Sequence, residues 1–340
     1  MSAMDEALTL TQAVSAATRP AARHRIGLAA GAFVGAETVV QATGPVSGDS
    51  LFQIGSVTKV FTALALADAV ARGELTLDTA LAALLPEVPT SRTGGSLTLG
   101  HLATHTSGLP RLPPGLLRRS LRHRADPYDG VTTEYLQDAL AGTRLRSEPG
   151  TRIRYSNFGA ALLGQALSRH TGRPYAHLVA ERLTGPLAMS DTAVDLRPEQ
   201  VTRKAAGHSR RGRSVPDWHL GAMAGAGALY STVPDLLTLL RAHLEPDGTA
   251  LSDALRLVQQ PRARRNRWLQ VGLGWFLSPV RSSGHTALWH NGGTGGFASY
   301  VAVLPAAEAG VVVLADTARS VDRLGVRLLA SLTGPVVPHP

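Results

Sequence analysis

The chain has 340 residues, of which 44% are hydrophobic and 17% charged, so it holds enough apolar material for a large folded core. It has no cysteine, which excludes disulfides, thiolate catalysis and cysteine-bound metals. Its formal net charge of +9 would suit a nucleic-acid partner only if the arginines were clustered among aromatic side chains.

The arginines are mostly dispersed, and their three clusters lie in segments rich in Gly, Pro or Ser that lack interleaved aromatic residues. The clusters are Arg118, Arg119, Arg122 and Arg124; Arg210, Arg211 and Arg213; and Arg262, Arg264, Arg265 and Arg267. We interpret them as solvated loops. A basic rim that attracts an anionic substrate or a phosphate-bearing carrier is the alternative. We expect no nucleic-acid partner.

The first 25 residues lack a basic start followed by an apolar segment, and the chain has no apolar run of about eighteen residues. We therefore expect no export signal, no membrane association and a cytoplasmic location.

The N-terminal quarter predicts a helix, a hairpin and a second helix. An amphipathic helix is predicted over 4–18, and strands rich in Val and Ala over 26–33 and 37–42. Nearly continuous apolar residues over 60–72 predict a buried helix that Gly73 closes. The middle block then alternates helices with long loops, and its helices are predicted over 97–104, 132–141, 158–171 and 175–183.

The C-terminal third returns to strands. A capping residue, a proline and an acid over 231–235 predict the start of a helix over 236–244. Strands are predicted over 272–277, 286–290, 297–304 and 310–315, with a closing helix over 320–332. Short connections favour an antiparallel sheet shared with the N-terminal hairpin. The predicted fold class is α+β, with residues 1–55 and 225–335 as a sheet domain and 56–224 as a mainly helical inserted domain.

Lys59 and Lys204 are the only lysines, whereas 32 further basic residues are arginines. Arginine keeps its proton in proteins, but a desolvated lysine can lose its own and act as a base. Ser56 precedes Lys59 by three residues, which places both on one face of a helix. This spacing suggests a serine nucleophile activated by an amine.

Two further motifs follow at long range. Tyr155-Ser156-Asn157 begins 99 residues after Ser56, and His290-Asn291-Gly292-Gly293 begins 135 residues after Tyr155. In this order the motifs resemble those of the penicillin-recognising serine hydrolases, which include class C β-lactamases, D-alanyl-D-alanine carboxypeptidases and related esterases. The resemblance covers 52–65, 97–109, 149–187, 225–240 and 289–314. It implies a β-lactamase/transpeptidase-like fold with the active site between the two domains.

The resemblance implies a role for each motif residue. Ser56 would become acylated, and Lys59 and Tyr155 would share the proton of the base without a fixed assignment between them. Asn157 would orient the substrate and bind Lys59 through a hydrogen bond. The backbone amides of Ser56 and Gly293 would hold the oxyanion.

His290, Asn291 and Gly292 would bind substrate. The commonest family pattern has lysine at position 290, so histidine there disfavours a β-lactamase and replaces a permanent cation by one that titrates. We therefore expect any preference for carboxylate-bearing substrates to weaken as the pH rises above about 6.5.

Other apparent motifs give weaker evidence of function. His101 and His105 have the spacing of a zinc pair, but no glutamate lies between them and no third ligand is evident, so we expect no metal. The glycines over 292–296 precede a strand and no Lys-Ser/Thr pair, which argues against a phosphate loop. There is also no G-x-S-x-G turn. We expect no cofactor.

The sequence thus predicts a serine hydrolase that acts on a small-molecule ester, amide or lactam. An intracellular esterase or amidase is the preferred interpretation, or a transacylase that uses an amine or alcohol acceptor. A D-alanyl-D-alanine carboxypeptidase and a class C-type β-lactamase are alternatives. A catalytically silent ligand-binding or scaffold protein is the alternative of another class.

Overall fold

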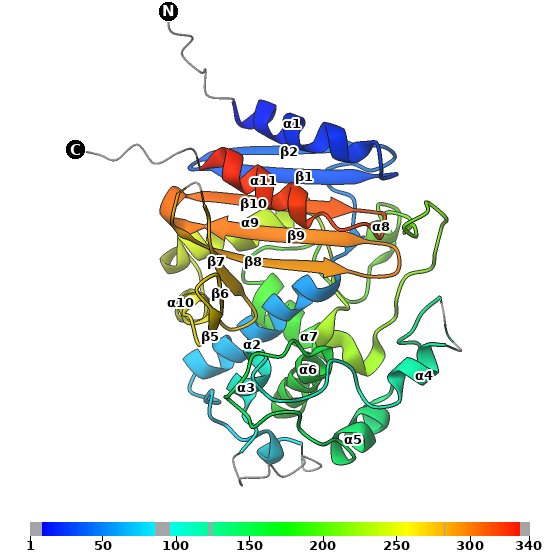
Figure 1. Ribbon diagram of the computed structural model, residues 1–340, viewed down its shortest axis with the longest axis vertical. Coiled ribbons are helices and arrows are strands. Elements are labelled where there is room, and N and C mark those ends of the chain that lie inside the picture. Colours follow the sequence, from blue (N-terminus) through cyan, green and yellow to red (C-terminus); the bar gives the residue numbers. More distant parts are fainter. Residues whose placement is uncertain (1–8, 86–95, 122, 124, 282, 334–340) are drawn as a thin grey trace, which may run out of the picture.

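The computed structural model describes residues 9–85, 96–121, 123, 125–281 and 283–333. An eight-stranded antiparallel sheet runs in the order β2-β1-β10-β9-β8-β7-β6-β5 (Figure 1). Its strands are β1 (Leu28–Val34), β2 (Glu37–Thr43), β5 (Ala263–Asn266), β6 (Leu269–Val271), β7 (Phe276–Pro279), β8 (Thr286–Gly293), β9 (Ala298–Leu304) and β10 (Ala309–Ala315). A small second sheet pairs β3 (Phe52–Gln53) with β4 (Tyr230–Ser231). Strand β1 pairs with β10, which confirms that the two ends of the chain share one sheet.

The helices are α1 (Leu10–Ala22), α2 (Thr58–Ala71), α3 (Leu99–Ala103), α4 (Leu116–Ser120), α5 (Thr133–Ala141), α6 (Asn157–Thr171), α7 (Tyr175–Val179), α8 (Pro198–Val201), α9 (Val233–Leu244), α10 (Ser252–Gln259) and α11 (Asp322–Leu332). Short 3₁₀ turns are η1 (Gly55–Val57), η2 (Leu81–Ala83), η4 (Gly221–Ala226), η5 (Pro246–Gly248) and η6 (Pro305–Ala307), and a π-type turn, η3 (Ala180–Thr184), continues α7. None of the helices in the described part of the chain has the length and apolar character that crossing a membrane requires.

The large sheet is covered on both faces because its central strands are apolar on both sides. Along β1, Leu28, Ala30 and Ala32 belong to the cluster that α1 and α11 cover, and Figure 1 shows these two helices together on one face. Ala29 and Phe33 belong to the second cluster, on the side of α9. Alternate residues of a strand point to opposite faces, so helices on both sides are needed to keep these side chains from water.

Helix α2 joins the sheet to the middle helices. All its residues from Thr58 to Ala69 are buried, as the continuous apolar run predicts. It packs against α10, α6 and α3. The turn at its N-terminal end meets β8 and β9. This buried helix therefore presents a fixed end to the sheet.

Several predicted elements have different bounds. The part of the first helix predicted over 4–8 lies outside the described residues, and the helix extends to Ala22. The strand predicted over 272–277 begins at Phe276, because Gly274 takes a left-handed turn (φ 71°) close to the backbone of Lys59. Helix α10 and strands β5 and β6 were not predicted, since they are short and β5 is rich in arginine.

Candidate active site

Ser56 lies on the 3₁₀ turn η1, which runs directly into the N-terminal end of α2. Lys59, in the first turn of α2, donates hydrogen bonds from Nζ to Ser56 Oγ at 3.0 Å and to the carbonyl oxygen of Ala226 at 2.6 Å. The sequence-predicted hydroxyl and amine therefore meet, and a second contact fixes the position of the amine.

Lys59 is almost fully buried, with 2% of its surface exposed. Its pKa lies well below the usual lysine value, first because burial penalises the ammonium and then because Arg111 is a nearby cation. Both effects favour the free amine. A free amine has a lone pair that can accept the proton of Ser56.

Tyr155 lies just before α6 and beside both groups. Its ring centroid is 5.0 Å from Lys59 Nζ and 5.3 Å from Arg111 Cζ. Burial raises the pKa of Tyr155 to about 12, although a hydrogen bond with Ser56 and the charge of Arg111 oppose this rise. The phenol is therefore protonated near neutral pH. Of the two bases left open by the sequence, this geometry favours Lys59.

Asn157, the first residue of α6, lines the same cleft as Ser56. Its backbone N–H donates to the carbonyl oxygen of Arg111 at 2.9 Å. Its side-chain Oδ1 is buried without a hydrogen-bond partner, so the predicted bond with Lys59 is not formed. That expectation was wrong because the amine of Lys59 is directed to Ser56 and Ala226 instead.

Gly292 allows β8 to approach the Ser56 turn. A Cβ atom at Gly292 would lie 2.0 Å from the carbonyl oxygen of Ile54 and 2.9 Å from the backbone nitrogen of Ser56. A Cβ atom at Gly55 would likewise lie 2.7 Å from the backbone nitrogen of Gly293. Only glycine fits such close backbone contacts. They bring the backbones of Ser56 and Gly293, the predicted oxyanion donors, into one place.

His290 is buried, with 1% of its surface exposed, and does not line the cleft. Its Nδ1 donates to the carbonyl oxygen of Asn291 at 2.7 Å, its Nε2 has no hydrogen-bond partner, and its ring stacks on Phe276 at 5.2 Å. Burial, with a smaller effect of the Lys59 charge, lowers the pKa of His290 to about 3. With this pKa the imidazole is neutral from pH 5 to 8, which argues against the expected loss of anion preference above pH 6.5.

Asn291, between His290 and Gly292, has its side chain directed to α11. Its Nδ2 donates to Asp322 Oδ2 at 2.9 Å, and it also lines the cleft that contains Ser56. Strand alternation explains why it differs from His290, whose side chain lies on the opposite face of β8.

The cleft around Ser56 has a volume of about 680 Å³. Five aromatic side chains contribute to its walls, and these are Tyr128, Tyr155, Trp218, Phe276 and Trp289. Two arginines, Arg111 and Arg265, also line it. Arg111 was not predicted as a site residue, although it lies two residues after the segment 97–109 that shares the family resemblance, and Arg265 was predicted only as a member of an arginine cluster.

The arginine clusters do not all lie in loops, contrary to the prediction from the sequence. Arg118 and Arg119 lie in α4, and Arg264 and Arg265 lie on β5, whereas the cluster over 210–213 does lie in a loop. The side chains of the cluster residues that the structure describes are largely solvated, but Arg265 belongs to the cleft. His101 and His105, which have the spacing of a zinc pair, make separate contacts: His101 Nδ1 accepts from Thr98 N at 3.2 Å, and the His105 ring packs 4.5 Å from that of Tyr155.

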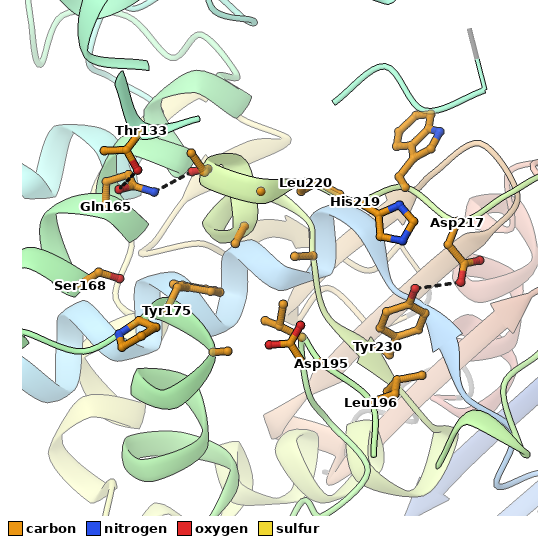
Figure 2. A pocket seen from close by; sticks show the side chains of 18 of the residues that line it. Thr133, Gln165, Ser168, Tyr175, Asp195, Leu196, Asp217, His219, Leu220 and Tyr230 are labelled. Atoms are coloured by element: carbon orange, nitrogen blue, oxygen red, sulfur yellow. Dashed lines mark hydrogen bonds between the residues drawn. The ribbon is translucent and has the colours of Figure 1, made fainter. Parts of the chain in front are cut away.

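A larger cavity, of about 860 Å³, lies between α5, α6, α7 and the loop after α8 (Figure 2). Ser56, Lys59 and Tyr155 do not line it. Its wall residues bind one another: Gln165 Nε2 donates to the carbonyl oxygen of Ala222 at 2.9 Å. Tyr230 OH likewise donates to Asp217 Oδ2 at 2.9 Å (Figure 2). The smaller cleft, not this cavity, holds the predicted catalytic groups.

Known proteins resemble the chain over most of its length. Residues 13–333 match the family model described as Beta-lactamase. The chain is 32% identical over 281 residues to the D-alanyl-D-alanine-carboxypeptidase/endopeptidase AmpH of Escherichia coli (strain K12), covering 78% of this chain and 71% of that protein. It is 33% identical over 272 residues to Esterase EstB of Burkholderia gladioli, covering 69% and 68%. The crystal structure of a class C beta lactamase from Rhodobacter sphaeroides has a TM-score of 0.81 and 27% identity, covering 94% of this chain and 98% of that one.

Proposed function

Because the chain belongs to the β-lactamase family of serine hydrolases, we propose that it cleaves an ester or amide through an acyl-enzyme formed on Ser56. The observation that supports this most directly is the 3.0 Å contact between Lys59 Nζ and Ser56 Oγ, made by a buried amine. A covalent intermediate divides one difficult acyl transfer into two easier steps.

In the proposed reaction, Ser56 Oγ attacks the substrate carbonyl carbon while its proton passes to Lys59 Nζ. The carbonyl oxygen becomes an oxyanion, which accepts hydrogen bonds from the backbone N–H groups of Ser56 and Gly293. When the tetrahedral intermediate collapses, the bond to the alcohol or amine breaks. The leaving group takes up the proton from Lys59 through the hydroxyl of Tyr155, which lies within hydrogen-bond reach of Ser56.

Deacylation reverses these steps with water. Lys59 removes a proton from the water through Tyr155, the resulting hydroxide attacks the acyl carbon, and Ser56 Oγ leaves with a proton. Asn157 would orient the acyl group, because its unpaired, buried Oδ1 can accept a hydrogen bond from a substrate amide.

We favour a small-molecule ester or amide as the substrate, because histidine at position 290 departs from the lysine of the commonest family pattern and so weakens the assignment as a β-lactamase. Transfer of the acyl group to an amine or alcohol instead of water is a variant of the same chemistry. D-alanyl-D-alanine carboxypeptidase and β-lactamase activities are the alternatives, the first being favoured by the similarity to AmpH.

Two further predictions accompany this proposal, one on the division into domains and one on the cellular location. Residues 1–55 with 225–335 would form one domain and 56–224 the other, and the cleft is lined by residues from both ranges, such as Trp289 and Tyr155. A cytoplasmic location is the second prediction, which fractionation of expressing cells would test.

Intact-protein mass spectrometry tests the nucleophile. We expect a p-nitrophenyl ester to leave an acyl adduct on the wild type and on Ser214→Ala, in which an exposed serine is replaced, but none on Ser56→Ala. An unlabelled wild type, or an undiminished adduct on Ser56→Ala, would reject the proposal. Relative turnover of the ester, a penicillin and a D-alanyl-D-alanine peptide then separates esterase, β-lactamase and peptidase, and added amine acceptors reveal transfer.

A further inference from the structure

The charge of the catalytic cleft is one-sided. Among the residues that line it, Arg111 and Arg265 are the only charged side chains, and no aspartate or glutamate is present. Within the described residues, neither guanidinium forms a salt bridge or a side-chain hydrogen bond. Two unpaired cations in a concave site raise the local concentration of anions.

Arg111 is held next to the catalytic groups by its backbone. Its carbonyl oxygen accepts hydrogen bonds from the N–H groups of Asn157 at 2.9 Å and Phe158 at 3.2 Å. Its Cζ lies 5.3 Å from the centre of the Tyr155 ring. A substrate that reaches Ser56 must therefore pass within the field of this guanidinium.

Arg265 is the member of its cluster that remains available to a ligand. Arg262 donates to Gln260 Oε1 at 2.9 Å, Arg264 donates to the carbonyl oxygen of Asn266 at 3.3 Å, and Arg267 lies over the Trp268 ring at 4.8 Å. Arg265 instead lines the cleft, together with Leu269, Phe276 and Trp289.

We propose, on the basis of the function proposed above, that Arg111 and Arg265 determine specificity for a carboxylate-bearing ester or amide by binding the anionic group of that substrate in the catalytic cleft. Guanidinium groups suit this task because their planar donors match a carboxylate and stay charged at every physiological pH. His290 cannot do this, since it is buried, lies outside the cleft wall and bonds its neighbour's carbonyl oxygen. Specificity for an anion thus comes from outside the three motifs.

Matched esters test the proposal. Mono-p-nitrophenyl glutarate and its methyl ester differ by one charge on the acyl side, and 4-acetoxybenzoate and its methyl ester differ by one charge on the leaving group. The readout is the ratio of kcat/KM for the charged ester to that for the neutral ester. Comparing this ratio between variants cancels the intrinsic reactivity of each ester and any change that loss of Arg111 causes in Lys59 basicity.

In at least one ester pair, we expect the ratio to fall about fivefold in Arg111→Gln and Arg265→Gln, and about tenfold or more in the double variant. Arg264→Gln, a neighbour on β5 that does not line the cleft, should keep the wild-type ratio. Arg111→Lys should give an intermediate ratio, since it keeps the charge but loses the planar donors. Added KCl should lower the wild-type ratio more than that of the double variant.

A ratio in the double variant within twofold of the wild type for both ester pairs overturns the inference. The neutral esters separate this failure from that of the proposed function. If they are hydrolysed through a Ser56 adduct while the ratio does not move, the function stands and the inference fails. If no ester acylates Ser56, the proposed function fails first. Hydrolysis of the neutral ester also verifies that each variant is folded.

Discussion

Lys59 and His290 are both buried nitrogen bases near Tyr155, and they differ in what their nitrogen atoms contact. Lys59 Nζ is 5.0 Å from the Tyr155 ring and bonds Ser56 Oγ at 3.0 Å. The His290 ring is 6.4 Å from that of Tyr155, and its Nδ1 bonds the carbonyl oxygen of the next residue. Burial lowers the pKa of both groups and favours their neutral forms.

The comparison shows that a lowered pKa does not by itself make a catalytic base. A base must also lie within hydrogen-bond reach of the proton that it removes. Lys59 meets this condition because it follows Ser56 by three residues at the start of one helix. The His290 ring instead packs beside the rings of Tyr155 and Phe276, where its neutral form can be buried.

Replacement of Lys59 should produce the largest effect. Lys59→Met removes the amine but keeps an apolar chain of similar length, and we expect acylation by a neutral p-nitrophenyl ester to slow by about 10²–10⁴-fold, the usual contribution of a general base. His290→Gln should slow it less than tenfold. Single-turnover release of p-nitrophenol measures both rates. Equal losses in the two variants would remove the distinction between the two nitrogens.

Motif spacing predicted the contact between Lys59 and Ser56 because local geometry links the two residues. Ser56 and Lys59 are joined by one turn of structure, and the buried character of α2 follows from its continuous apolar residues. The shared sheet was also predictable, since the strands are apolar and closely connected in sequence. Glycine at position 292 is explained by the backbone of Ile54, 2.0 Å from where a Cβ would be.

The environment of His290 and Arg111 could not be predicted in this way. The sequence suggested a substrate-binding histidine with an ordinary pKa, but the ring stacks on Phe276 of the neighbouring strand and lies near Tyr155, which comes from a distant segment. Likewise, Arg111 reaches the cleft because its carbonyl oxygen anchors the start of α6. Such long-range packing leaves no mark in local residue patterns.

The pH dependence of the free energy of unfolding should show that His290 has a structural role. With its pKa lowered to about 3, the folded protein keeps His290 neutral, whereas the unfolded chain takes up a proton below about pH 6.5. The stability that depends on the neutral ring is thus present above pH 6.5 and is lost as the pH falls toward 3. At pH 5 the loss is roughly 2 kcal/mol.

We therefore expect the free energy of unfolding of His290→Gln to fall less between pH 7 and pH 5 than that of the wild type, by up to about 2 kcal/mol. Urea denaturation at the two pH values measures it. His243→Gln, at a position outside the motifs, should show a similar effect, because burial lowers the pKa of His243 to about 4. The same acid sensitivity in wild type and His290→Gln would mean that His290 titrates normally in the folded protein.

The smallest expected effect is the absence of a pH switch in substrate choice. If Arg111 and Arg265 bind the substrate carboxylate, the kcat/KM ratio of mono-p-nitrophenyl glutarate to its methyl ester should be constant from pH 5.5 to 8, because neither the guanidinium groups nor His290 change charge in that range. Any change of Lys59 protonation with pH affects both esters and cancels in the ratio. A ratio that declines with a midpoint near pH 6.5 would instead make the third motif the anion site, since among side chains only an imidazole ordinarily titrates there. His290 would then have to reach the cleft during turnover, and its burial would describe only the resting arrangement.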